Sequence, residues 1–217
     1  EKIMTGLPGY VVVVLIMQLL WWFGIHGPNV MSAVTTPFMT KMMATNLELY
    51  QAGEGVTASG VFYTAGSKYS IIANPFASGW FSSTGSGITM GLIVAIMLFS
   101  KRDDFKAIAK LAIPCGLFNI NEPIIFGIPM VMNAMFAVPF FLAPVACVCC
   151  GYLVQSLGLC PLFVIDVPWT TPVGLFGFLA SSGNIMGGIW QIVIIVGVST
   201  LIYTPFVIAA NRQTEEA

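Results

Sequence analysis

Long apolar stretches alternate with polar breaks along most of this sequence. A helix that crosses a hydrocarbon layer of roughly 30 Å needs about 20 apolar residues. Three stretches meet this requirement and predict spanning helices at residues 7–25, 124–153 and 185–210. A fourth stretch, residues 88–99, is long enough only if the Ser- and Gly-rich segment 82–87 also lies at membrane depth. The pattern predicts a polytopic, all-α integral membrane protein.

Two segments between the apolar stretches have a different character. Residues 31–50 mix apolar and polar positions in a helical rhythm, which predicts a helix with a polar face toward water or a cavity. Residues 51–80 are rich in Gly, Ser, Thr and Asn, and we expect them to be irregular. The apolar run 8–23 leads into a Gly-Ile-His-Gly-Pro sequence instead of a cleavage site, which favours a spanning helix over a signal peptide.

Composition supports a membrane location. Of the 217 residues, 57% are hydrophobic and only 8% are charged, against about 25% charged in ordinary soluble domains. The balance of 8 basic and 9 acidic residues argues against a nucleic-acid surface, which needs clustered Lys and Arg. The one strong charge cluster, residues 101–106 with Lys110 close behind, is typical of a solvated turn between spans. The positive-inside rule predicts that this turn is cytoplasmic.

The five cysteines all lie in apolar surroundings, with no His or carboxylate at metal-ligand spacing. We interpret them as packing residues, although the Cys-x-Cys-Cys cluster at 147–150 leaves a redox or metal device open. We expect no disulfide framework, no metal and no cofactor. The cysteines are Cys115, Cys147, Cys149, Cys150 and Cys160.

Between residues 111 and 211 the only formal charges are Glu122 and Asp166, and each lies beside a Pro-containing break in an apolar run. Proline removes a backbone donor and disfavours helix in the preceding residue, so we expect helices to stop at Glu122 and Val167. Broken helices at membrane depth are tolerated only inside protein or along a wet cavity, and paired breaks point to a transporter binding site. We therefore predict two re-entrant hairpins that meet near the midplane.

Glu122 is the strongest candidate for chemistry. An ionised carboxylate in a spanning region costs several kcal/mol and needs donors or water around it, and sugar hydroxyls are such donors. The structural alternative is that Glu122 accepts N–H groups at an adjacent helix start. Neutral polar side chains near the two breaks add donors and acceptors. They are Asn119, Asn121, Asn133, Thr170 and Thr171.

His26 and the tryptophans are the other candidates. Imidazole can both donate and accept, but a lone histidine is as readily a satisfied structural residue. Trp169, beside the second break, is a plausible stacking platform for a sugar ring, because both present flat apolar faces. Trp21 and Trp22 fit that role or a membrane-interface belt equally well. We expect Asp166 to cap the second hairpin. Soluble catalytic motifs are absent, so covalent chemistry would need a partner protein.

Three segments are similar to motifs of a known family. Residues 119–133 read NINEPIIFGIPMVMN, residues 167–174 read VPWTTPVG and residues 22–27 read WFGIHG. In this order they resemble the lactose/cellobiose/diacetylchitobiose family of phosphotransferase-system EIIC components. The resemblance covers only the C-terminal, substrate-binding half of that family. It implies that residues 1–217 form the transport half of an EIIC domain and that the N-terminal dimerisation half would precede Glu1.

The resemblance also implies a function: a permease of the bacterial plasma membrane that binds a disaccharide such as cellobiose, lactose or diacetylchitobiose. The sugar would be phosphorylated at the cytoplasmic face by a phosphocysteine on a separate EIIB protein or domain, and the full-length protein would be a homodimer. Glu122 and His26 would be the catalytic pair and would hold sugar hydroxyls. The other implied substrate-binding residues are Asn121, Thr171, Trp21 and Trp169.

Two other classes remain open from the residues alone. An ion-coupled secondary transporter would use Glu122 and Asp166 as proton or cation sites. A non-transporting membrane scaffold would bind no sugar.

Overall fold

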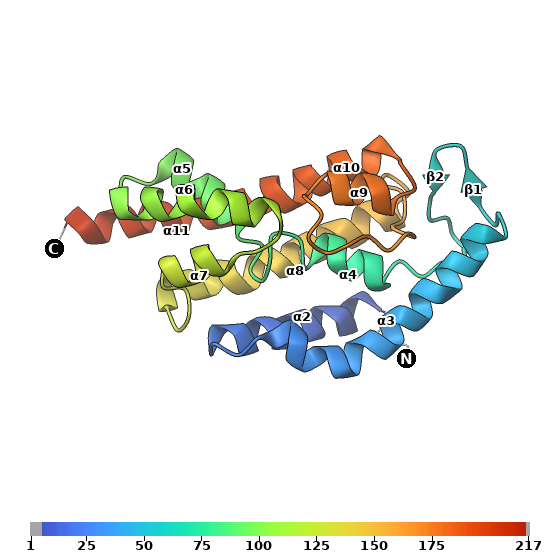
Figure 1. The fold of residues 1–217 in the computed structure, drawn as a ribbon, viewed down its shortest axis with the longest axis horizontal. Coiled ribbons are helices and arrows are strands. Elements are labelled where there is room, and N and C mark those ends of the chain that lie inside the picture. The colour runs from blue at the N-terminus through green and yellow to red at the C-terminus, as the bar shows by residue number, and fades with distance from the viewer. Residues whose placement is uncertain (1–5, 216–217) are drawn as a thin grey trace.

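The structure, a computed structural model, describes residues 6–215, and helices dominate it (Figure 1). Residues 1–5 and 216–217, which the predicted transport domain includes, lie outside the described residues. The elements in chain order are α2 (Leu7–Trp22), α3 (Gly27–Gln51), β1 (Val56–Thr57), β2 (Gly60–Val61), α4 (Asn74–Trp80), α5 (Met90–Phe99), α6 (Asp103–Leu117), α7 (Glu122–Gly127), α8 (Ala134–Ser156), α9 (Leu175–Ala180), α10 (Ile185–Ile192), the π-helical η1 (Val193–Val198) and α11 (Ser199–Glu215).

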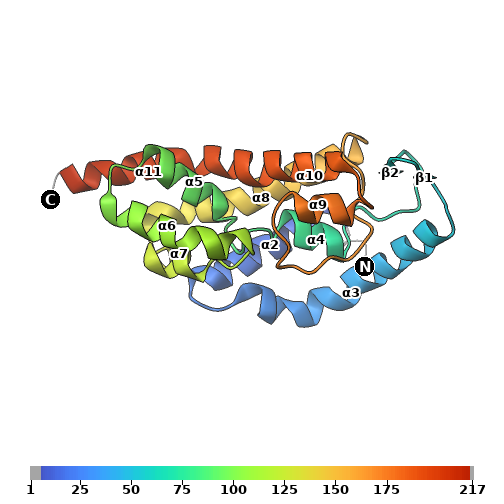
Figure 2. The same ribbon diagram turned by 45° about the horizontal axis from the view of Figure 1, so that its top comes forward.

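Two long apolar helices run along the length of the molecule (Figures 1 and 2). One is α8, with 23 residues; the other is the continuous run from Ile185 through η1 to Arg212, with 28 residues. Within the described residues these two are long and apolar enough to cross a membrane. The shorter apolar helices α2 and α5 pack against them, α2 on α8 and α5 on α11.

The buried apolar side chains form two clusters. In the first, the rings of Trp80 and Phe163 stack in parallel with centroids 5.1 Å apart, which fixes α4 against the segment that follows α8. The second cluster, around Phe136 and Tyr203, joins α8 to α11.

Several predicted elements agree with the structure. The first apolar run forms α2, which ends at Trp22 because the chain turns at Gly24, where φ is +81°. The segment of mixed polarity forms α3, and the short run before residue 100 forms α5.

Four expectations were wrong. No helix stops at Val167, which lies in the non-helical segment between the end of α8 at Ser156 and the start of α9 at Leu175. The run 124–153 is not one helix, because Ile128 takes the extended conformation favoured before Pro129 and separates α7 from α8. Glu122 begins a helix instead of ending one, since Pro123 occupies a first-turn position whose N–H would be unpaired anyway. The segment 51–80 is not wholly irregular: it contains α4 and the antiparallel β1–β2 pair, so the fold is not strictly all-α.

Candidate functional site

A cavity of about 770 Å³ lies where four separate parts of the chain meet. These parts are the junction of α2 and α3, the loop before α5, the loop between α6 and α7, and the loop that carries Trp169. The lining residues are Trp21, His26, Pro28, Asn29, Phe81, Ser82, Gly85, Ser86, Asn119, Ile120, Asn121, Glu122, Pro123 and Trp169.

The junction of α2 and α3 holds His26 in a defined orientation. Gly27 lies so close to α2 that a Cβ atom there would be 2.0 Å from the carbonyl oxygen of Met17. His26 is the N-cap of α3, and its Nδ1 accepts a hydrogen bond from the backbone N–H of Asn29 at 3.2 Å. Because Nδ1 is the acceptor, the neutral ring carries its proton on Nε2. His26 therefore offers an N–H donor beyond its capping bond.

Trp21 lies next to His26 and is almost fully buried. The two ring centroids are 4.8 Å apart, with an angle of 53° between the ring planes. Only 5% of Trp21 is exposed, yet its indole N–H has no partner among the described residues. An unpaired buried donor costs about 1–3 kcal/mol, so a ligand oxygen or a water that met this group would be stabilised.

Glu122 is the acid of the cavity. It is exposed and is the first residue of α7, where the partial positive charge of the helix start stabilises a carboxylate. Within the described part of the chain, its side chain has neither a hydrogen bond nor an ion pair, so the alternative role in bonding backbone N–H groups is not realised. Its oxygens remain available as acceptors.

Two buried asparagines join the walls of the cavity. The amide nitrogen of Asn121 donates to the carbonyl oxygen of Ser86 at 2.6 Å. The side-chain oxygen of Asn119 accepts from the backbone N–H of Thr84 at 2.7 Å, while its nitrogen donates to the carbonyls of Trp169 and Thr171, the latter at 2.9 Å. Each asparagine is only 4% exposed. The two asparagines of the first break thus hold the loop before α5 and the loop that carries Trp169 in place.

The structure brings together most of the predicted site residues. Glu122, His26, Asn121, Trp21 and Trp169 all line the cavity. Thr171 does not line it.

Two polar residues singled out near the breaks have structural partners. Asp166 lies outside the cavity and accepts a hydrogen bond from the Asn74 amide at 3.1 Å. It does not cap the nearby helix α9, whose N-cap is Gly174. Asn133 is the N-cap of α8 and accepts from the N–H of Met135 at 3.0 Å.

The sequence pattern alone did not identify the wall formed by residues 81–86, or Asn29. A signal was present in the dense Ser, Gly and Thr of residues 82–87, which form tight turns with positive φ at Thr84, Gly85 and Gly87. Gly85 is required by its neighbour as well as by its φ of +76°, because a Cβ atom there would be 2.2 Å from Cγ of Asn121.

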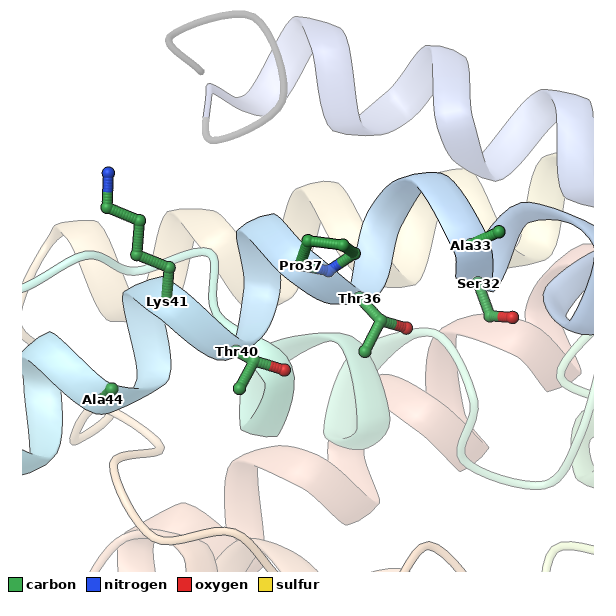
Figure 3. A pocket seen from close by; sticks show the side chains of 7 residues that line it. All are labelled: Ser32, Ala33, Thr36, Pro37, Thr40, Lys41 and Ala44. Carbon is green, nitrogen blue, oxygen red and sulfur yellow. The ribbon is translucent and has the colours of Figure 1, made fainter.

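A second hollow, of about 700 Å³, follows one face of α3 (Figure 3). Its walls come from this single helix, and they include the hydroxyl residues Ser32, Thr36 and Thr40, with Lys41 toward the far end. Its lining, as far as the described residues go, has no acid and no aromatic ring and shares no residue with the first cavity. One helix face cannot surround a ligand, so the cavity at Glu122 is the stronger candidate.

No group of three or more His, Cys, Asp or Glu residues with metal-binding potential occurs among the described residues. The five cysteines are free thiols.

The long apolar helices are those of a membrane protein, and the cavity that Glu122 lines is its candidate binding site. The family model "Phosphotransferase system, EIIC" matches residues 2–144, and the chain belongs to this family. It is 36% identical over 215 residues to the cellobiose-specific EIIC component of Lactococcus lactis, covering 94% of this chain and 43% of that protein. It is 33% identical over 210 residues to the oligo-beta-mannoside-specific EIIC component of Bacillus subtilis, covering 96% and 44%.

A solved structure is also similar. The crystal structure of the transporter ChbC, the IIC component from the N,N'-diacetylchitobiose-specific phosphotransferase system, matches with a TM-score of 0.85 and 33% identity. The match covers 96% of this chain and 46% of ChbC. The chain therefore spans less than half the length of the relatives that it matches, and its fold and membrane location are those of the family.

Proposed function

We propose that this chain is the substrate-binding part of a sugar permease of the phosphoenolpyruvate-dependent phosphotransferase system. Its substrate would be a disaccharide such as cellobiose, lactose or diacetylchitobiose, the sugars named in the descriptions of its relatives. The phosphoryl donor would be a separate EIIB protein or domain, since one relative is a lactose-specific EIICB component. A homodimer of the full-length protein is part of the proposal through the resemblance alone.

The observation that carries this proposal is the composition of the cavity. One cavity of about 770 Å³ is lined by a carboxylate and an indole N–H that have no partner in the described part of the chain, by an imidazole with an N–H donor and by a half-exposed tryptophan ring. Binding cavities for small molecules measure about 300–1,000 Å³, so a disaccharide fits the available volume. Alternating donors, acceptors and flat ring faces are what a sugar requires.

The residues have separate tasks in the proposed reaction. Glu122 accepts the hydrogen bond of one sugar hydroxyl, and Nε2–H of His26 donates to a sugar oxygen. As the hydroxyl oxygen attacks the phosphorus atom of the EIIB phosphocysteine, Glu122 takes the hydroxyl proton, the P–S bond breaks and the thiolate leaves. Phosphoryl transfer depends mainly on such positioning and on charge stabilisation. Trp169 and Trp21 hold the sugar ring.

The loops at the two breaks would be re-entrant hairpins in the membrane. Two observations support this: buried Asn119 of the first break pairs the carbonyls of Trp169 and Thr171 in the second, and both breaks contribute residues to the cavity wall. Non-helical backbone at membrane depth is tolerated under those conditions.

The proposal is tested by uptake of radiolabelled cellobiose, lactose and diacetylchitobiose in membrane vesicles that contain the full-length protein. At least one labelled sugar should accumulate as its phosphate, and only when phosphoenolpyruvate and the EIIB protein are supplied. Uptake of free sugar that is abolished by collapsing the ion gradient would instead support the ion-coupled transporter. Nothing in the comparisons supports that alternative, and Asp166 lies outside the cavity.

A further inference from the structure

The loop that carries Trp169 has few attachments of its own. Residues 168–171 form a turn in which the N–H of Thr171 donates to the carbonyl of Pro168 at 2.9 Å. The Trp169 side chain is 56% exposed, and its ring makes no hydrogen bond or ring contact with any described residue. Within the described residues, no hydrogen bond or ring contact fixes the indole independently of its backbone.

One side chain donates hydrogen bonds to that backbone from outside the loop. Among the described residues, the hydrogen bonds that link residues 167–173 to parts of the chain other than this loop and α9 are both donated by Asn119. The loop is fixed separately at its ends: Asp166 bonds to Asn74, and Gly174 donates to the buried Gln191 at 2.8 Å. Val167 and Val173 also pack against the apolar core at the two ends of the loop. Between these anchors, Asn119 supplies the hydrogen bonds that reach the turn from outside in the described part of the chain.

Asn119 is itself fixed relative to Glu122 and to the loop before α5, which forms another wall of the cavity. It lies three residues before Glu122, and its side-chain oxygen accepts from the N–H of Thr84. Both amide hydrogens and the amide oxygen are thus used, each by a different backbone group, inside a region where Asn119 is 4% exposed.

A simpler explanation of Asn119 covers only its backbone. Its φ is +66°, and the next residue, Ile120, donates its N–H to the carbonyl of Cys115, which closes α6. Asparagine and glycine both suit this left-handed position at a helix end. Glycine would serve the helix end equally well, so the three side-chain bonds require a second explanation.

We infer that Asn119 is a positioning residue that sets the distance between the Trp169 ring and the Glu122 carboxylate, and thereby determines how tightly a sugar is held between them. The inference rests on the proposed function for the identity of the ligand. Loss of the side chain leaves the helix end intact but frees the Trp169 turn, so the sugar must immobilise that turn when it binds.

The matched variants are Asn119→Gly, which suits the positive φ and removes only the side chain, and Asn119→Asp, which keeps the acceptor for Thr84 but places an oxygen against the two carbonyls. Asn46→Ala is the control, because Asn46 is a buried carboxamide that bonds both the N–H and the carbonyl of Ser70 away from the cavity. All are made in the full-length protein, purified in detergent.

The first measurement needs no sugar. Hydrogen exchange of a peptide that covers residues 166–172 should be faster in Asn119→Gly and Asn119→Asp than in the wild type, and unchanged in Asn46→Ala. An exchange rate equal to that of the wild type in both Asn119 variants would overturn the inference, because it would show that the turn is held without the Asn119 side chain.

The second measurement is a double-mutant cycle with cellobiose titrated calorimetrically. Asn119→Gly should weaken binding about tenfold, as should Trp169→Ala, whereas adding Asn119→Gly to Trp169→Ala should weaken it less than about twofold. Additive losses would show that Asn119 does not act through Trp169 and would overturn the inference. Failure of the wild type to bind cellobiose, lactose or diacetylchitobiose would overturn the proposed function. Faster hydrogen exchange of residues 166–172 in the Asn119 variants would still support the positioning role of Asn119.

Discussion

The two broken segments of this chain look equivalent in sequence and differ in structure. Each places one acid beside a proline in an otherwise ionless apolar region, Glu122 in the first and Asp166 in the second. Glu122 lines the cavity and has no hydrogen-bond partner among residues 6–215, whereas Asp166 lies outside the cavity and bonds to Asn74.

The difference comes from the neighbouring residues. In the first break, Asn119 and Asn121 supply the hydrogen bonds that hold the loops, so the acid at the start of α7 is available to a ligand. In the second break, Asp166 makes the structural hydrogen bond to Asn74, and Trp169 is the residue that faces the cavity. An isolated acid in a membrane segment is therefore a functional candidate only after its hydrogen-bond partners are known.

The largest expected effect is that of Glu122→Gln. The amide keeps the size of the side chain but cannot take a proton from the attacking hydroxyl, and proton transfer of this kind contributes about 10²–10⁴-fold. Phosphorylation-coupled sugar uptake should fall by at least about 100-fold, while the thermal unfolding temperature stays near that of the wild type. Near-normal uptake would remove the proposed role of Glu122 and with it the contrast between the two acids.

Gly85→Ala should give the next largest effect. The new Cβ atom would meet Asn121 at 2.2 Å at a residue whose φ is +76°. Strain and overpacking together should destabilise the protein by about 2–5 kcal/mol and displace the wall of the cavity. Thermal unfolding in detergent, with and without sugar, measures both.

Gly66→Ala is the control for Gly85→Ala. Gly66 has a φ of +88°, but apart from its two chain neighbours no described residue lies within 4 Å of the place that an alanine methyl group would take, so only the backbone strain remains. If the two variants lose equal stability, the contact between Gly85 and Asn121 does not shape the site.

Asp166→Asn should have a small effect. The amide oxygen can still accept from Asn74, and the residue does not reach the cavity, so sugar uptake should stay within about threefold of the wild type. A loss as large as that of Glu122→Gln would make the two breaks functionally equivalent and would favour the ion-coupled alternative.

The smallest effect is expected at Asp104, an exposed acid already paired with a cation. Its bond to the Arg102 guanidinium, at 2.5 Å, lowers the pKa of the Asp104 carboxyl below its ordinary value. The pair therefore stabilises the fold above that ordinary pKa, and this contribution is lost as the pH falls through the lowered one. Asp104→Asn should change stability by less than about 1 kcal/mol at pH 7. Thermal unfolding from pH 7 to pH 3 checks this, and a large loss at neutral pH would contradict it.

Part of the fold and site was predictable from local patterns. Apolar length predicted α2, α5 and the final helix, and the mixed polarity of residues 31–50 predicted α3, because burial in lipid or protein acts on each helix through its own side chains. Glu122 was predictable for the same local reason, since an ion in an apolar run is costly wherever it lies. The division between α7 and α8 was missed although Pro129 marks it, because the apolar residues on either side hide a break of six residues.

The sequence by itself determined that the chain is a membrane protein with two polar breaks and, through its motifs, the family to which it belongs. Only the tertiary structure decided which acid is free, that Nδ1 of His26 is occupied by Asn29, and that residues 81–86 complete the cavity. It also decided that Asn119 joins segments 35 and 50 residues away. The physical reason is that apolar burial is a property of each residue and its near neighbours, whereas a hydrogen bond depends on a partner that the folded chain brings from elsewhere.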